Sequence, residues 1–366
     1  MTTAPEITAS FLTAGAILFA AACSSDNGPT GSDGSLGFAD LSCSIPEGEI
    51  LDGGPGKDGI PALTDPTFVN PEASEAGYLL DQDRVVGLMV DGEPLAIPLN
   101  IFWWHEIVNL NVGERALAIT HCPLTGSSLG FDRSTVDGAE FGVSGLLFRN
   151  NLIMYDRTNQ ESLWPQMFRE ARCGPKDGTD LGMVPVMEMT WAGWQGLHPD
   201  TRVVSSSTGF NRDYQRYPYG NYDDLNNSQV LFPVDVDPRR PPKERVLGIP
   251  LDSGGSIALP FGELETRGSR AAIHLDATDS PMVVFWDAGR NTAMAYRPSV
   301  QEQALSFRME GGELRDTETG STWRVDGLAV AGPLEGARLQ PVAEAFIAFW
   351  FAWPAFYPEI ELWTAS

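Results

Sequence analysis

From about residue 80 onward the chain consists of short apolar runs, each closed by a turn signal. Val85 to Val90 is one such run, Asp91-Gly92 follows it, and Pro94 to Leu99 forms the next. Runs of this length, bounded by Gly, Pro, Asn or Asp, are typical of β-strands. We therefore expect a mainly β protein with a few short helices, of the α+β class.

Two segments carry a helical spacing instead. Trp191 and Trp194 stand three residues apart, and so do Trp350 and Trp353. Residues at this spacing share one face of a helix. We expect a short helix near each pair, with its tryptophans packed against a sheet in preference to stacking on a ligand.

Matching segments occur in the same order in two parts of the chain. The pairs are Arg84–Gly92 with Arg245–Asp252, Ser162–Trp164 with Ser321–Trp323, Gly174–Val186 with Gly332–Val342, and Trp191–Asp200 with Trp350–Glu359. Ordered self-similarity of this kind indicates an internal duplication. We expect two tandem pseudo-repeats, 58–206 (the first half) and 245–366 (the second half), joined by a Pro- and Asp-rich connector at 207–244.

The N-terminus has the pattern of an export signal. Ile7 to Ala22 carries no charge, and small residues lead directly to Cys23 and a polar Gly/Ser/Asp stretch. Such a run suits a signal core and is short for a transmembrane helix. We expect a signal peptide at 1–22 and a tether and irregular lead-in at 23–57, with Cys23 as the lipidated residue. The expected location is the cell envelope, on the periplasmic side or the cell surface.

This signal departs from the usual lipoprotein pattern in two ways. No Lys or Arg precedes the apolar core, and Leu is absent at the third position before Cys23. An ordinary secretory signal is therefore the alternative.

Charge excludes several classes of partner. The 366 residues include 24 basic and 49 acidic side chains, for a net charge of -25. Binding to nucleic acid or to an anionic membrane surface requires clustered Lys and Arg. We therefore expect contact with the membrane only through the lipid anchor, and a small molecule or a protein thiol as the substrate.

The number of cysteines is odd once Cys23 is set aside, so one thiol has no disulfide partner. With Cys23 lipidated, Cys43, Cys122 and Cys173 remain. An exported protein meets an oxidising compartment, so one disulfide and one free thiol are expected, with three possible pairings.

The clearest candidate for chemistry is the segment in which an apolar strand-like run, Ala116 to Thr120, stops at His121-Cys122. Pro123 follows, and Thr125 stands three residues after the Cys. A thiol is reactive as the thiolate, which nearby donors or positive charge stabilise. Thr125 is the better-placed partner, because adjacent strand residues such as His121 and Cys122 point to opposite faces.

The duplication adds weight to Cys122. In the second half, Val283 to Trp286 aligns with Ala118 to His121, so Cys122 corresponds to Asp287. A residue needed only for packing would recur in both halves. The alternatives for Cys122 are a buried structural thiol or one half of a disulfide.

A second cluster is His105-Glu106, after two tryptophans. His105 could act as base, donor or metal ligand beside Glu106, or it could be a hydrogen-bonded His in a buried aromatic segment. With His121 and Cys122 it would supply ligands suited to zinc or copper. The sequence lacks G-x-S-x-G, P-loop, dinucleotide and C-x-x-C motifs, so no organic cofactor is expected.

Several segments together form a specific combination of motifs. They are Asp58–Leu63, Trp104–Asn109, Cys122–Gly126, Phe141–Leu147, Met154–Arg157 and Ser162–Trp164. With Pro241–Val246 they resemble the bacterial and archaeal DUF3179 family over residues 58–366, a family whose name records an unknown function. Selenoproteins among its members imply a redox-active chalcogen. Thr125 stands here where some relatives have Cys, which argues against a dithiol cycle.

Three hypotheses follow. The first is an exported, lipid-anchored protein with single-thiol chemistry of the peroxidase or oxidoreductase type at Cys122, which passes through a sulfenate. Thr125 and His121 would tune the thiol, with His105 and Glu106 nearby. The second is a zinc or copper protein with His105, His121 and Cys122 as ligands. The third is a non-enzymatic binding module of the envelope.

Overall fold

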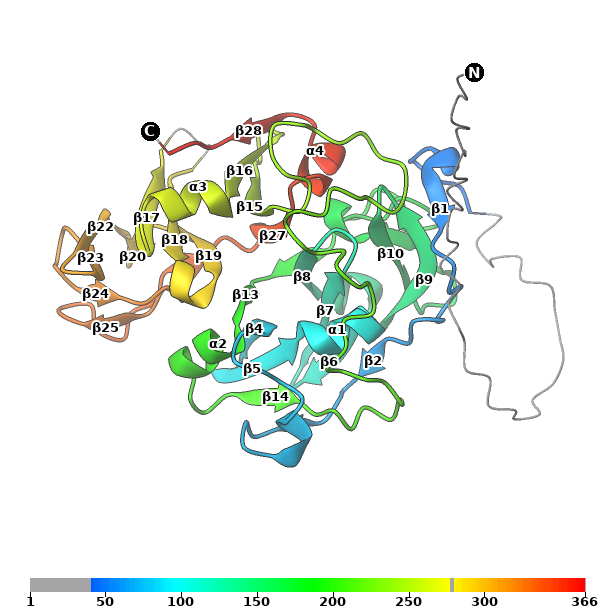
Figure 1. Ribbon diagram of the computed structural model, residues 1–366, viewed down its shortest axis with the longest axis horizontal. Coiled ribbons are helices and arrows are strands. Elements are labelled where there is room, and N and C mark those ends of the chain that lie inside the picture. The colour runs from blue at the N-terminus through cyan, green and yellow to red at the C-terminus, as the bar shows by residue number, and fades with distance from the viewer. Residues whose placement is uncertain (1–40, 277–279, 366) are drawn as a thin grey trace, which may run out of the picture. The chain divides into compact units, whose positions relative to one another are not determined.

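The computed structural model describes residues 41–276 and 280–365 (Figure 1). The architecture is mainly β, with 40% strand and 13% helix, which confirms the expected class. The α-helices are short: α1 (Leu99–His105), α2 (Trp191–Leu197), α3 (Phe261–Thr266) and α4 (Ala352–Phe356). The 3-10 turns are η1 (Glu47–Glu49), η2 (Ser74–Ala76), η3 (Arg133–Val136), η4 (Gln166–Phe168) and η5 (Ala288–Arg290).

The first half contains two five-stranded sheets and three strands of a four-stranded sheet, whose fourth strand, β1, precedes this half. One has the order β13-β4-β5-β14-β3, with β3 (Phe68–Val69), β4 (Arg84–Val90), β5 (Glu93–Pro98), β13 (Met187–Thr190) and β14 (Arg202–Val204). The next has the order β12-β8-β7-β6-β2, with β2 (Leu63–Thr64), β6 (Ile107–Val112), β7 (Arg115–Cys122), β8 (Ser127–Asp132) and β12 (Gly182–Val184). The third has the order β1-β9-β10-β11, with β1 (Ile50–Asp52), β9 (Phe141–Phe148), β10 (Asn151–Asp156) and β11 (Leu163–Pro165).

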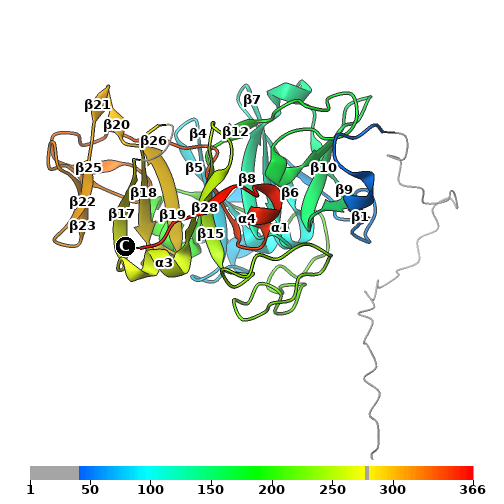
Figure 2. The ribbon, with the colours of Figure 1, turned by 90° about the horizontal axis from the view of Figure 1, so that it is seen from above.

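The second half contains three four-stranded sheets and a two-stranded ribbon. The first is β27-β15-β16-β28, with β15 (Arg245–Pro250), β16 (Ser256–Pro260), β27 (Phe346–Phe349) and β28 (Ile360–Leu362). The second, whose central strands are labelled in Figure 2, is β17-β18-β19-β26, with β17 (Arg270–Leu275), β18 (Met282–Asp287), β19 (Thr292–Arg297) and β26 (Gln340–Pro341). The third is β22-β23-β24-β25, with β22 (Phe307–Glu310), β23 (Glu313–Asp316), β24 (Thr322–Trp323) and β25 (Ala329–Ala331). The ribbon pairs β20 (Ser299–Val300) with β21 (Gln303–Ala304).

The two halves contain sheets with corresponding strand order. In each, a hairpin (β4–β5 or β15–β16) pairs with a later strand on one edge and takes a parallel strand on the other. Gly87 and Gly248 lie against the indoles of Trp194 and Trp353, where a Cβ would come within 2.2 Å and 2.1 Å of ring carbons. The duplication inferred from the sequence stays a prediction, and these shared features are what it would require.

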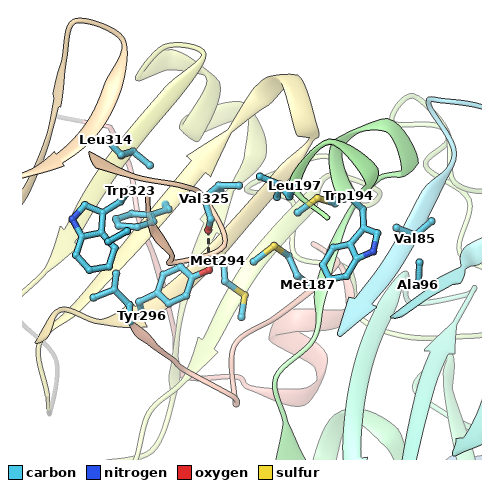
Figure 3. Close-up of a cluster of buried hydrophobic side chains, with 14 of the residues drawn as sticks. Val85, Ala96, Met187, Trp194, Leu197, Met294, Tyr296, Leu314, Trp323 and Val325 are labelled. Carbon is cyan, nitrogen blue, oxygen red and sulfur yellow. Dashed lines mark hydrogen bonds between the residues drawn. The ribbon is translucent and has the colours of Figure 1, made fainter. Parts of the chain in front are cut away.

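Buried apolar side chains form separate clusters within and between the halves. Inside the first half, Val86, Ile97, Phe102 and Leu117 belong to one cluster, contributed by both five-stranded sheets and α1. A second cluster, drawn in Figure 3, combines residues of both halves, among them Trp194 of α2. The halves therefore share a hydrophobic core.

The segments outside the halves also pack. Cys43 is disulfide-bonded to Cys173, and β1 pairs with β9, so the last part of the expected lead-in belongs to the folded unit. The connector at 207–244 has no strand or α-helix and runs past α1, yellow-green in Figure 1. Among the described residues no helix has the length and apolar character needed to cross a membrane. The expected signal peptide and Cys23 lie outside these residues.

Candidate functional site

Cys122 is the last residue of β7, and a tight turn leads from it into β8. Gly126 in this turn has a φ of 60°, and a Cβ there would lie 2.9 Å from the ring of Phe349. The amide of Phe349 donates to the carbonyl oxygen of Thr125 at 2.8 Å. The turn therefore requires glycine, and β27 of the second half holds it in place.

Among the cysteines that the structure describes, Cys122 is the free thiol, since Cys43 and Cys173 form the disulfide. Its side chain is 1% exposed. The Sγ accepts a hydrogen bond from the Leu152 amide at 3.3 Å and donates to the carbonyl oxygen of Asn150 at 3.6 Å. The Thr125 hydroxyl and amide also interact with the sulfur in the sense that lowers the thiol pKa. Thr125 is thus the partner of Cys122, as its spacing suggested.

Burial nevertheless dominates the acidity of this thiol. Removal from water is the largest effect and the nearby Glu106 carboxyl adds to it, and together they raise the pKa of Cys122 to about 11 against the hydrogen bonds from Thr125 and Leu152. A thiol with this pKa is protonated at neutral pH, and the thiolate is the nucleophile. In this conformation Cys122 is covered and unreactive.

Glu106 stands at the end of α1 with a positive φ of 55°. Its carbonyl oxygen accepts the His121 amide at 2.8 Å, which places Glu106 opposite the end of β7. The residue is 7% exposed, and burial raises the pKa of its carboxyl to about 8. The carboxyl beside the thiol therefore holds a proton at neutral pH.

A network of buried polar side chains surrounds Thr125 on the face of β7 that carries Cys122. Asn151 donates to the Thr125 hydroxyl at 3.0 Å and to Gln166 at 2.9 Å, and Ser127 donates to Gln166 at 2.6 Å. Gln166 in turn donates to Thr120 at 2.7 Å. Such a satisfied network holds Thr125 in one position. Sequence reasoning missed Ser127, Asn151 and Gln166, whose motifs carry no local signal.

His121 faces the other side of the sheet. Its Nδ1 lies 2.9 Å from the Ser128 hydroxyl, which donates to Glu188 at 2.7 Å. Glu188 pairs with Arg84 at 3.0 Å and with Arg245 of the second half at 2.8 Å. Burial lowers the pKa of His121 to about 3, so its ring is neutral. The geometry gives no support to the expectation that His121 tunes the thiol, because strand alternation turns it towards this ion-pair cluster.

His105 is also engaged elsewhere. Its Nδ1 lies 2.7 Å from the carbonyl oxygen of Pro61, and its Nε2 lies 2.8 Å from the hydroxyl of Tyr214 in the connector. Burial lowers the pKa of His105 to about 4. The neutral ring therefore donates from Nδ1 and accepts from Tyr214 at Nε2, and it links α1 to the connector.

Residues of the connector contact the turn between β7 and β8 and the neighbouring Asn150. The Tyr222 hydroxyl donates to the carbonyl oxygen of Leu124 at 3.0 Å. The Asn150 side chain exchanges two hydrogen bonds with the backbone of Phe232, at 2.9 and 2.8 Å. The ammonium of Lys243 lies 3.3 Å from the Tyr222 ring centroid and donates to the Tyr222 carbonyl oxygen at 3.0 Å. The cluster of tyrosines between Tyr214 and Tyr222 is the sequence signal that could have revealed this role.

The metal hypothesis has no geometric support. Residues 41–276 and 280–365 contain no group of three His, Cys, Asp or Glu side chains that could hold a metal ion. The hydrogen bonds of His105 and His121 point them to separate partners, away from a shared site with Cys122. Cys122, Thr125 and Glu106 are the residues that come together.

Comparison with known proteins identifies a family without an activity. No curated protein and no solved structure matches this chain. A family model described as a protein of unknown function, DUF3179, matches residues 57–360. This match confirms the resemblance seen in the motifs, and the chain belongs to the DUF3179 family.

Proposed function

We propose that this protein is an exported thiol oxidoreductase of the single-cysteine type, in which Cys122 reacts after the connector moves away from it. The observation that carries the proposal is that two features of the structure act in opposite directions on the ionisation of the Cys122 Sγ. Thr125 and Leu152 supply hydrogen bonds that stabilise a thiolate, while the connector supplies the burial that suppresses it. Opening of the connector would remove the burial and leave the donors in place.

The hydrogen-bond donors around the Cys122 Sγ argue against a purely structural role for this thiol. A buried cysteine that only fills space behaves as a small hydrophobic residue and needs no donors. Here the backbone amides of Thr125 and Leu152 and the Thr125 hydroxyl all converge on one sulfur. Hydrogen bonds to the charged form favour that form, as donors do at other activated sites.

The reaction proposed is reduction of a hydroperoxide. The Cys122 sulfur attacks one peroxide oxygen, so an S–O bond forms as the O–O bond breaks, and the sulfur is oxidised to a sulfenic acid. The other oxygen leaves as an alcohol or water after it takes a proton. Two molecules of an external thiol then reduce the sulfenic acid, which yields one disulfide and one water and restores Cys122.

In this proposal Glu106 moves that proton. Its carboxyl lies near the thiol and is protonated at neutral pH in the closed site. Once the site opens, the carboxylate accepts the thiol proton and the carboxylic acid returns it to the leaving oxygen. His105 acts at a distance from the reaction, because its ring holds the connector through Tyr214.

The test is the rate of sulfenic acid formation with hydrogen peroxide, measured as trapping by dimedone and mass spectrometry. Tyr222→Phe removes the hydrogen bond to Leu124, and Asn150→Gly removes the side-chain contacts to Phe232. Glycine at 150 suits the φ of 65° there. Each variant should react about tenfold faster than wild type, since a broken anchor bond costs about 1 to 1.5 kcal/mol.

Tyr296→Phe is the matched control, because this hydroxyl also donates to a backbone carbonyl, of Val325 at 2.8 Å in the second half. It should react at the wild-type rate, and Cys122→Ser should show no trapped product. Equal rates in wild type and in both anchor variants, or no sulfenic acid in any of them, would contradict the proposal.

Export and lipid anchoring at Cys23 form a separate part of the proposal. The disulfide between Cys43 and Cys173 supports it, because such bonds persist in oxidising compartments. Expression of the full chain with radiolabelled palmitate should label wild type and leave Cys23→Ser unlabelled. Label retained in Cys23→Ser, or absent from both, would remove this part.

A further inference from the structure

A cavity of about 250 Å³ lies between the two halves, with residues of both in its wall. Met187, Trp194 and His198 line it from the first half, and Met294, Asp326 and Arg338 line it from the second. The residues around Cys122 do not contribute to it. It is therefore a feature independent of the thiol.

The walls of the cavity are mostly apolar. Figure 3 shows Met187 and Trp194 beside Met294 of the opposite half, within the hydrophobic cluster that both halves share. Methionine thioethers are polarisable and flexible, and they favour contact with aromatic rings and irregular apolar shapes. Apolar pockets with a few convergent polar groups are the usual form of small-molecule sites.

One end of the cavity is polar and rigidly held. His198 Nε2 lies 3.5 Å from the Asp326 carboxylate, and its ring packs on Trp194 with centroids 4.3 Å apart. Arg324 donates to Asp326 and to the carbonyl oxygen of Leu197, at 2.9 and 3.0 Å. These contacts fix the imidazole in one orientation before any ligand enters.

The second nitrogen of His198 is an unused acceptor. Burial lowers the pKa of His198 to about 4, so the ring is neutral at neutral pH. Its proton belongs on Nε2, which faces the carboxylate, and Nδ1 keeps its lone pair. In the described part of the chain no hydrogen bond reaches Nδ1, and this nitrogen is open to solvent although His198 as a whole is only 7% exposed.

At this end one carboxylate faces two guanidinium groups, and the half-exposed Arg338 carries the surplus positive charge towards solvent. Asp326 is paired with Arg324, and Arg338, 48% exposed, lies 3.9 Å from the same carboxylate. A buried charge without a partner is costly. The apolar walls supply no partner for a buried charge, so a ligand matched to these walls is uncharged.

We propose that this cavity binds a small, uncharged aromatic molecule that carries one O–H group and donates it to Nδ1 of His198. The thioethers and the indole contact the apolar body of the ligand. The site would serve binding independently of Cys122.

The test compares 2-naphthol with 2-methoxynaphthalene, which keeps the ring system and lacks the donor. Calorimetric titration of the full wild-type chain should give saturable binding of 2-naphthol at one site per chain, at least tenfold tighter than that of 2-methoxynaphthalene. This comparison needs no variant. No saturable binding of 2-naphthol, or equal affinity for both compounds, would overturn the proposal.

Two variants locate the site. His198→Phe keeps a ring on Trp194 and should reduce the preference to less than about twofold. Met294→Trp fills the cavity and should abolish binding of both compounds, with the melting temperature as the check on folding. Cys122→Ser should bind as wild type does. Unchanged 2-naphthol binding in a folded Met294→Trp would place the ligand elsewhere and refute the assignment.

Discussion

Strands β7 and β18 have similar positions in their sheets, but their last residues differ in chemical type. β7 ends at Cys122 and β18 at Asp287, and each is followed by a turn into the next antiparallel strand. The Asp287 carboxylate accepts from Arg270 at 3.0 Å and Arg290 at 2.7 Å, and it caps the turn through the Arg290 amide. Among the described residues no cation influences the acidity of Cys122, and the charged group that does is the carboxyl of Glu106, neutral at neutral pH.

The difference between the two residues follows from how far solvent reaches each turn. Arg270 is 43% exposed, so solvent reaches the cationic side of the ion pairs although the Asp287 side chain is only 6% exposed. Near Cys122 the connector instead bonds to the backbone of Leu124 through Tyr222 and to the side chain of Asn150 through Phe232. A charged group is stable at the open turn and a neutral one at the covered turn, because desolvation of a charge is costly. The presence of the connector thus distinguishes the end of β7, the candidate site, from the end of β18.

Exchange of the two residues is the strongest test of this comparison. Cys122→Asp should lower the free energy of unfolding by about 4 kcal/mol, because a second carboxyl is buried beside Glu106 with no cation. Asp287→Cys should cost less, about 2 kcal/mol, since it removes a turn cap and two ion pairs whose arginines stay partly solvated. Urea unfolding at pH 7 measures both. Equal losses would mean that the connector does not set the difference.

The two glycines beneath the tryptophans test what the halves share. Gly87→Ala and Gly248→Ala should each cost about 3 kcal/mol in unfolding free energy, because the added methyl group overlaps an indole in either half. Gly196→Ala is the control, since a Cβ there meets nothing within 4 Å and alanine suits a helix. A large loss in one half alone would argue against a shared packing.

The pH dependence of stability tests the neutral acid beside Cys122. Burial raises the pKa of Glu106 to about 8, so the folded protein binds this proton more tightly than the unfolded chain. Stability from this group is present at low pH and is lost as pH rises towards 8, by up to about 1.4 kcal/mol per pH unit. Glu106→Gln should flatten this part of the curve between pH 5 and 8.

The buried histidines change stability in the opposite sense. His105 and His121 have lowered pKa values, so their contribution is lost as pH falls below about 6.5. Both histidines are present in wild type and in Glu106→Gln. Their contribution to the free energy of unfolding therefore cancels when the values from the two series of urea unfolding experiments are subtracted. A difference independent of pH would show that Glu106 ionises normally in the fold.

A smaller effect is expected at a pair of buried indole hydrogen bonds. Trp164 donates to Asp156 at 2.7 Å, and Trp323 donates to Asp316 at 2.9 Å. Replacement of either Trp by Phe should cost about 1 to 2 kcal/mol, because a buried carboxylate loses one donor. Thermal unfolding with calorimetry compares them. Losses that differ severalfold would show that the two halves use this contact differently.

Local patterns predicted some of the strands and the position of a short helix. The run expected at Val85 to Val90 is β4, and the tryptophan spacing marks α2. The strand expected to stop at Thr120 extends to Cys122, because His121 and Cys122 pair with Ser128 and Ser127 of β8. That cross-strand pairing also sets the partners of both residues, and periodicity in one strand carries no information about its neighbour.

By itself the amino-acid sequence determined the β class, the family and the position of Cys122 and Thr125 at one turn, since each depends on residues close together in the chain. The tertiary structure decided which cysteines pair, where His121 and His105 turn, and what covers the thiol. Leu124 and Tyr222 are far apart in sequence and meet only in the folded chain. Long-range packing of that kind sets burial, and burial sets the ionisation of Cys122 and Glu106.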